Sequence, residues 1–94
     1  MNKEELNKMA DKIIESDFFE KYATKIGTSI IIVYDCYNLE CNCIQIQLDC
    51  WRTLQGIHKS FDKLVRELGE DLVSKHYVCK YDGSCANEAK IYFK

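Results

Sequence analysis

The first apolar pattern of the chain has helical spacing. Apolar positions in residues 2–27 recur every three or four residues, which predicts an amphipathic helix. They are Leu6, Met9, Ala10, Ile13, Ile14, Phe18, Tyr22 and Ile26. Asn2 and Glu5 have the spacing of a capping box, and a kink or restart is expected where the stripe shifts at residues 16–17. Gly27 is suited to end the helix, because glycine adopts positive φ without steric cost.

Two strands are predicted next. Residues 28–35 are rich in β-branched side chains, and residues 43–49 alternate between apolar and polar. Ile44, Ile46 and Leu48 share one face of the second strand, so this strand is expected to be buried on one side only.

A second helix is predicted from its N-cap Asp49 to Gly69. Gly56 then lies inside the helix, at a cost of up to ~1 kcal/mol relative to Ala. Residues 75–82 and 88–93 form a second pair of strands around an Asp-Gly-Ser turn. The apolar face of the helix comprises Leu54, Ile57, Phe61, Leu64, Val65 and Leu68.

An internal repeat underlies this order. Residues 19–27 match residues 61–69, with Phe, Lys and Gly at equivalent positions, and residues 31–35 match residues 78–82. The chain is therefore predicted to contain one αββ unit twice.

The order αββαββ predicts an α+β fold. Its simplest form is a two-layer sandwich, in which two helices cover one face of a four-stranded antiparallel sheet. A length of 94 residues fits a single domain. Its two halves are residues 1–49 and 50–94.

Composition narrows the classes of function. A net charge of −2 gives no general attraction to nucleic acid or to an anionic membrane. The polar N-terminus lacks the apolar run of a signal peptide, so a cytoplasmic protein is expected. The bias towards Lys, Ile, Asn and Tyr matches AT-rich codons, as in a low-GC bacterium or its phages.

The six cysteines suggest zinc only weakly. Cys36, Cys41 and Cys43 cluster in the first strand connection, and Cys79 and Cys85 flank the second. Structural zinc ligands usually come in pairs separated by two to four residues, and the gap between Cys79 and Cys85 is longer. We expect reduced thiols on strands, with no metal and no cofactor, and a zinc site is the alternative.

Catalysis has little support in the sequence. No nucleophile elbow, zinc-protease motif or phosphate-binding loop is present. His58 lies near the edge of the apolar helix face and His76 lies on a strand, so only a Cys–His pair formed in space stays open. We expect a protein that is not an enzyme.

The hairpin ends are the first candidate binding surface. Tyrosines and acidic residues gather there, and loops on a rigid scaffold often carry binding residues. The alternative is that Asp35 and Asp82 only start turns. The candidates for contact with a host protein are Tyr34, Asp35, Tyr37, Glu40, Tyr81, Asp82 and Glu88.

Two further surfaces are candidates. The first strand is apolar on both faces, so the face without helices is expected to favour self-association as a homodimer through Ile31, Val33, Val78 and Tyr92. Alternatively, four cations on one ridge of the second helix can follow a phosphate backbone: Arg52, Lys59, Lys63 and Arg66. Ordinary surface pairs with Asp62 and Glu67 of the same helix explain this ridge, as is usual for charged residues on a helix.

In size, composition, mild acidity and small α+β layout, the chain resembles phage-encoded anti-defence proteins, among them anti-CRISPR inhibitors. The resemblance covers the whole chain and carries no motif. It implies stoichiometric binding, in which the inhibitor occupies a nucleic-acid site of a host enzyme or blocks a conformational change.

The cysteine interpretation predicts that folding needs no metal. Elemental analysis of protein purified without chelator is expected to show no stoichiometric zinc. One zinc per chain would instead make ligands of Cys36, Cys41, Cys79 and Cys85.

Overall fold

A computed structural model describes residues 1–33, 42–49, 56–81 and 85–94; for residues 80–81 and 85–87 it describes the backbone alone. The elements along the chain are α1 (Lys3–Ile14), α2 (Asp17–Tyr22), β1 (Ile30–Val33), β2 (Cys43–Gln47), α3 (Ile57–Leu68), the 3-10 turn η1 (Glu70–Leu72), β3 (Val73–Tyr81) and β4 (Cys85–Phe93).

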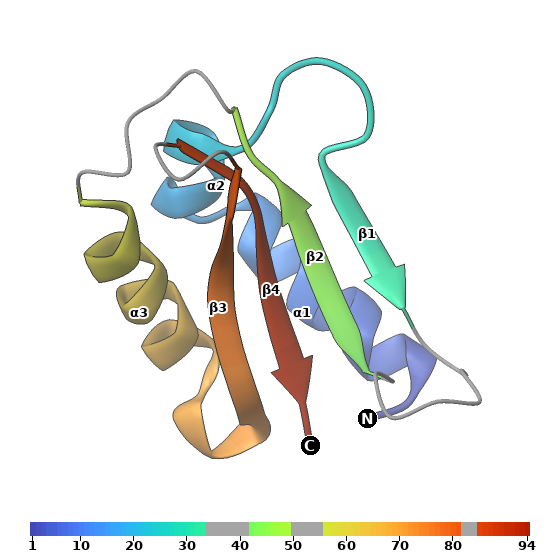
Figure 1. The fold of residues 1–94 in the computed structure, drawn as a ribbon. Coiled ribbons are helices and arrows are strands. Elements are labelled where there is room, and N and C mark those ends of the chain that lie inside the picture. Colours follow the sequence, from blue (N-terminus) through green and yellow to red (C-terminus); the bar gives the residue numbers. More distant parts are fainter. Residues whose placement is uncertain (34–41, 50–55, 82–84) are drawn as a thin grey trace.

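The four strands form one antiparallel sheet in the order β1-β2-β4-β3. In the view of Figure 1, α1 and α2 lie behind the sheet and α3 lies beside β3. The apolar side chains of the helices form a single core with the inner residues of the strands. The predicted two-layer α+β fold is therefore confirmed, with the first helix divided into α1 and α2.

The hydrogen bonds of one serine side chain explain why the first helix is divided. The Ser16 hydroxyl donates to the carbonyl of Ile13 at 2.5 Å and accepts from the amide of Phe19 at 3.2 Å, so it ends one helix and caps the next. The expected restart is confirmed. At the N-terminus, Asn2 Oδ1 accepts from the amide of Glu5 at 2.8 Å, as in a capping box.

The predicted end of the first helical segment at Gly27 is wrong. α2 ends at Tyr22, and the backbone then pairs with the end of β2: Ala23 bridges Leu48, and the amide of Thr24 donates to the Gln47 carbonyl at 2.9 Å. These backbone hydrogen bonds to β2 replace the ones that would continue the helix. Ile26, expected in the core, is 86% exposed as a result.

The second long helix also begins later than predicted. α3 starts at Ile57, and Gly56, expected inside the helix, is its N-cap with φ of +80°. Glycine suits this position because other residues seldom adopt positive φ. Leu54 lies outside the described residues. The predicted stop at Gly69 is confirmed, and the 3-10 turn η1 follows it.

The repeat is visible in the order of the strands. β1 and β3 are the edges, and β2 and β4 are the paired centre, so exchanging the two hairpins leaves the order unchanged. The helical part of the repeat is not preserved, because residues 23–27 leave the helix whereas residues 65–68 belong to α3. The expected alignment of residues 19–35 with residues 61–82 at both helix ends is therefore wrong, and superposition of the strands that follow stays a prediction.

The core lies between the two layers. Ile44 and Ile46 of β2 and Ile91 of β4 have no exposed surface. The ring of Phe61 on α3 packs against that of Phe18 on α2, with centroids 5.1 Å apart and an interplanar angle of 30°. In the part of the chain described, every helix is too short or too polar to cross a lipid bilayer.

A matched pair of substitutions tests this core. Ile46→Val is expected to lower the free energy of unfolding by about 0.5–1.5 kcal/mol, because it removes a buried methylene. Ile26→Val removes the same group from an 86% exposed side chain and should change stability by less than ~0.5 kcal/mol. Urea denaturation measures both, and equal losses would contradict the fold.

Candidate protein-binding face

The sheet face opposite the helices is the one extended surface of described strands that no described helix covers. Side chains alternate between the faces of a sheet, so the register assigns one set of residues to this side. We call it the open face. It comprises Ile31, Val33, Cys43, Gln45, Gln47, Lys75, Tyr77, Cys79, Glu88, Lys90 and Tyr92.

Aliphatic side chains from β1 form one side of the open face. Ile31 is 39% exposed and Val33 is half-buried. The predicted placement of Val78 beside them is wrong, since Val78 pairs with the buried Ala89 and packs against the core. The opposite parity of β3 explains the error, because Tyr77 and Cys79 take the outward positions.

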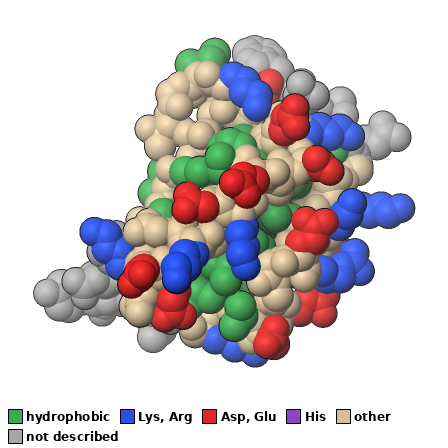
Figure 2. Space-filling view, turned by 180° about the vertical axis from the view of Figure 1, so that it is seen from behind, with side chains coloured by type: hydrophobic (Ala, Val, Ile, Leu, Met, Phe, Trp, Pro, Cys, Tyr) green, Lys and Arg blue, Asp and Glu red, His purple; other side chains and the backbone are tan. Residues whose placement is uncertain are grey.

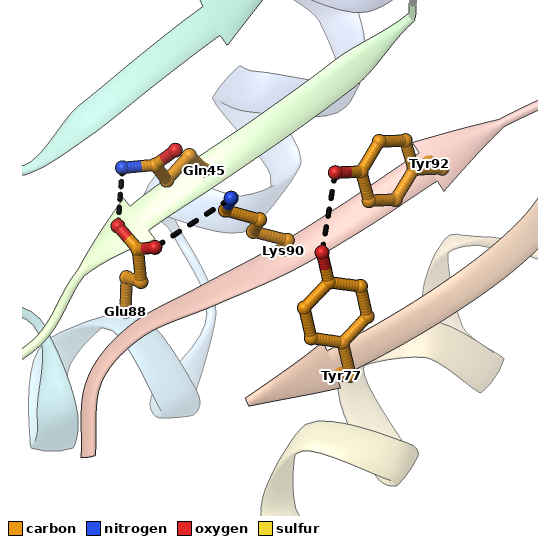
Figure 3. Close-up of polar contacts among 5 residues, drawn as sticks. All are labelled: Gln45, Tyr77, Glu88, Lys90 and Tyr92. Carbon is orange, nitrogen blue, oxygen red and sulfur yellow. Dashed lines mark hydrogen bonds and ion pairs between the residues drawn. The ribbon is translucent and has the colours of Figure 1, made fainter. Parts of the chain in front are cut away.

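Two tyrosines form the other side of the open face. The rings of Tyr77 and Tyr92 stack with centroids 6.0 Å apart and an interplanar angle of 21°, and their hydroxyl oxygens lie 3.3 Å apart (Figure 3). The ammonium of Lys75 lies 4.5 Å from the centroid of the Tyr92 ring, within cation–π range. Tyr92 is buried, whereas Tyr77 is 39% exposed.

A polar chain crosses the middle of the open face. The Gln45 amide donates to Glu88 Oε2 at 2.6 Å, and Lys90 Nζ lies 3.6 Å from Glu88 Oε1 (Figure 3). All three side chains are half-buried. The carboxylate is thus held from β2 and from its own strand, which fixes its orientation before any partner binds.

This carboxylate also shifts the pKa of its neighbours. Burial, and then the charge of Glu88 and a hydrogen bond to it, raise the pKa of Cys79 above its ordinary value. For Lys90, burial lowers the pKa, but Glu88, Tyr77 and Cys79 outweigh burial and the net shift is upward. At neutral pH the face therefore presents a neutral thiol beside an ion pair.

The predicted hairpin-end cluster is only partly described. Glu88 lies within β4 opposite Cys79, rather than at a connection, because β4 starts at Cys85 and not at Glu88 as expected. Tyr81, of which only the backbone is described, is the last residue of β3. Outside the described residues lie Tyr34, Asp35, Tyr37, Glu40 and Asp82.

The predicted basic ridge lies on the helical side of the molecule. Lys59, Lys63 and Arg66 are exposed on α3, and Arg52 lies outside the described residues. Figure 2 shows acidic and basic side chains intermixed over this side. Asp62 of the same helix contacts His76 Nε2 at 2.9 Å. The ridge is therefore part of a mixed-charge surface.

The described thiols, Cys43 and Cys79, form no disulfide bond with each other, and both lie on the open face. They face Tyr92 and Glu88, four residues apart on β4, so they are far from each other. Within residues 1–33, 42–49, 56–81 and 85–94, no group of three metal-binding side chains comes together. The expectation of no zinc stays a prediction.

Comparisons of the chain with protein-family models, with curated proteins and with solved structures give no match.

Sequence reasoning missed several residues of the open face: Gln45, Lys75, Tyr77, Cys79 and Lys90. The alternation of residues 75–79 and 88–92 could have identified them. The outward positions are the odd-numbered residues of β3 and the even-numbered residues of β4. Assigning the parity of β3 required its register with β4, which pairs Val78 with the buried Ala89.

Glu88→Gln is expected to lower the pKa of Cys79, because it removes the negative charge that opposes the thiolate and leaves Lys90 to favour it. The rate of alkylation at Cys79, followed by peptide mass spectrometry against pH, should rise at lower pH in this variant. Glu67→Gln on exposed α3 is the matched control and should leave the profile unchanged. An unchanged profile in both variants would contradict the contact.

Proposed function

We propose that this protein is a non-catalytic binding module that acts by covering a surface of another protein with its open face. The observation that carries the proposal is the organisation of this face. Aliphatic residues lie on one side, a tyrosine pair on the other, and a bonded polar chain between them. Such a mixture is typical of protein interfaces.

Pre-organisation supports a role in recognition. The contacts of Tyr77 with Tyr92, and of Glu88 with Gln45 and Lys90, hold these side chains in place in the free protein. Binding then requires less loss of side-chain entropy. Tyr77 is the exposed member of its pair and is the expected anchor, because tyrosine is enriched among interface residues that dominate binding energy.

The finer proposal concerns the partner. The resemblance to phage-encoded anti-defence proteins supports a cytoplasmic inhibitor of a host defence or nucleic-acid-processing enzyme, which works stoichiometrically. Direct binding of nucleic acid through Lys59, Lys63 and Arg66 is the alternative, and a self-associating housekeeping protein is another. A net charge of −2 favours a protein partner over nucleic acid.

The experiment begins with affinity capture from a low-GC bacterial lysate, followed by binding measurements with the purified partner. Tyr77→Ala is expected to weaken binding about 30-fold, the effect of losing a residue that contributes about 2 kcal/mol. Lys63→Ala on the helical side is the control and should bind as the parent does.

The opposite pattern would refute the proposal. If no partner is captured, and the protein instead shifts DNA or RNA in a gel with strong salt dependence, the basic ridge is the working surface. Loss of that shift in the Lys59→Glu, Lys63→Glu double variant would assign the binding to α3.

A further inference from the structure

The outer edge of β1 carries backbone groups that no described strand satisfies. β1 is a terminal strand, and the amide of Gln47 donates to the Ser29 carbonyl at 2.9 Å. Antiparallel ladders alternate, so the backbone groups of Ile31 and Val33 also point towards β2. The N–H and C=O groups of Ile30 and Ile32 consequently point away from the sheet.

The two edges of the sheet differ in protection. β3, the opposite edge, contains Lys75, His76 and Lys80 and has register irregularities at both ends. Charges and bulges of this kind discourage pairing with another strand. β1 has the sequence Ile-Ile-Ile-Val, with no charge and a regular register.

The core is also incomplete at this edge. Ile30 and Ile32 point towards the helices but are only half-buried, whereas Ile44 and Ile46 on the adjacent strand are fully buried. On the open face, Ile31 is 39% exposed. Apolar surface therefore reaches the edge on both sides of β1, next to backbone donors and acceptors that no described strand pairs.

A strand that fits this edge has to be apolar on both faces. Among the described strands, β2 presents Gln45 and Gln47 on one face, and β3 and β4 carry charged residues. β1 alone is apolar throughout. We propose that β1 pairs antiparallel with β1 of a second copy, which joins the two sheets into one across a twofold axis.

The backbone sets the register of this pairing. Ile30 and Ile32 supply the outward groups, so Ile30 of one copy forms a hydrogen-bonded pair with Ile32 of the other, and the reverse. The twofold axis then passes beside Ile31, which faces Ile31 of the second copy on the open face. The pairing uses residues 29–33 alone and does not depend on the proposed function.

Charged variants at the axis test the pairing by light scattering at micromolar concentration. The parent is expected at about twice the 11.0 kDa of one chain. Ile31→Lys and Ile31→Glu should each be monomeric, because like charges would lie directly opposite. An equimolar mixture of the two should recover the mass of a dimer. Ile26→Lys and Ile26→Glu, at an exposed site away from β1, are the matched controls and should stay dimeric.

A monomeric parent would overturn the proposal. So would dimers that survive Ile31→Lys, or a mixture that fails to recover, since both would exclude Ile31 from the axis. A monomeric parent that gains a partner's strand at β1 would assign the edge to a different protein.

Amide hydrogen exchange provides a second measurement without any substitution. The amides of Ile30 and Ile32 should exchange more slowly as protein concentration rises, while the amide of Ile31, already directed at β2, should not change. Exchange at Ile30 and Ile32 that is independent of concentration would overturn the pairing even if the charged variants failed to fold.

Discussion

The structure depends on burial of one face of a four-stranded sheet against a single layer of helices. The central strands contribute Ile44, Ile46 and Ile91 to this contact, and the helices contribute Leu6, Ile13 and Phe61, all with almost no exposed surface. The described helices of this short chain form one layer only. The second face and the edges of the sheet must therefore be stabilised by their own side chains or by another molecule.

The open face is stabilised by its own side chains. The tyrosine pair and the chain through Glu88 satisfy one another across strands, as cross-strand pairs do in antiparallel sheets. The β1 edge requires another molecule, because no described strand pairs with its outward backbone groups and Ile30 and Ile32 are only half-buried. Pairing through β1 would leave the open faces of two copies side by side on one continuous sheet, doubling the surface available to a bound protein.

Local patterns predicted most of the fold. The alternation of residues 43–49 and the helical stripe of residues 57–68 identified β2 and α3, because each pattern matches the burial that the fold requires. The failures have a tertiary cause. Sheet pairing by Ala23 and Thr24 ends α2 early, against the helical spacing that continues to Ile26. The polar contacts of the open face join residues from different strands, so a linear pattern contains no record of them.

The central claim is that the helices leave the open face exposed in the free chain and that a partner protein covers it. A neutral paramagnetic agent added to isotopically labelled protein measures this through the loss of NMR signal from exposed groups. In the free protein the Tyr77 ring should lose signal strongly and the Ile46 methyl groups should not, and with the partner bound the Tyr77 ring should become protected. A Tyr77 ring already protected in the free chain, or still exposed in the complex, would contradict the account.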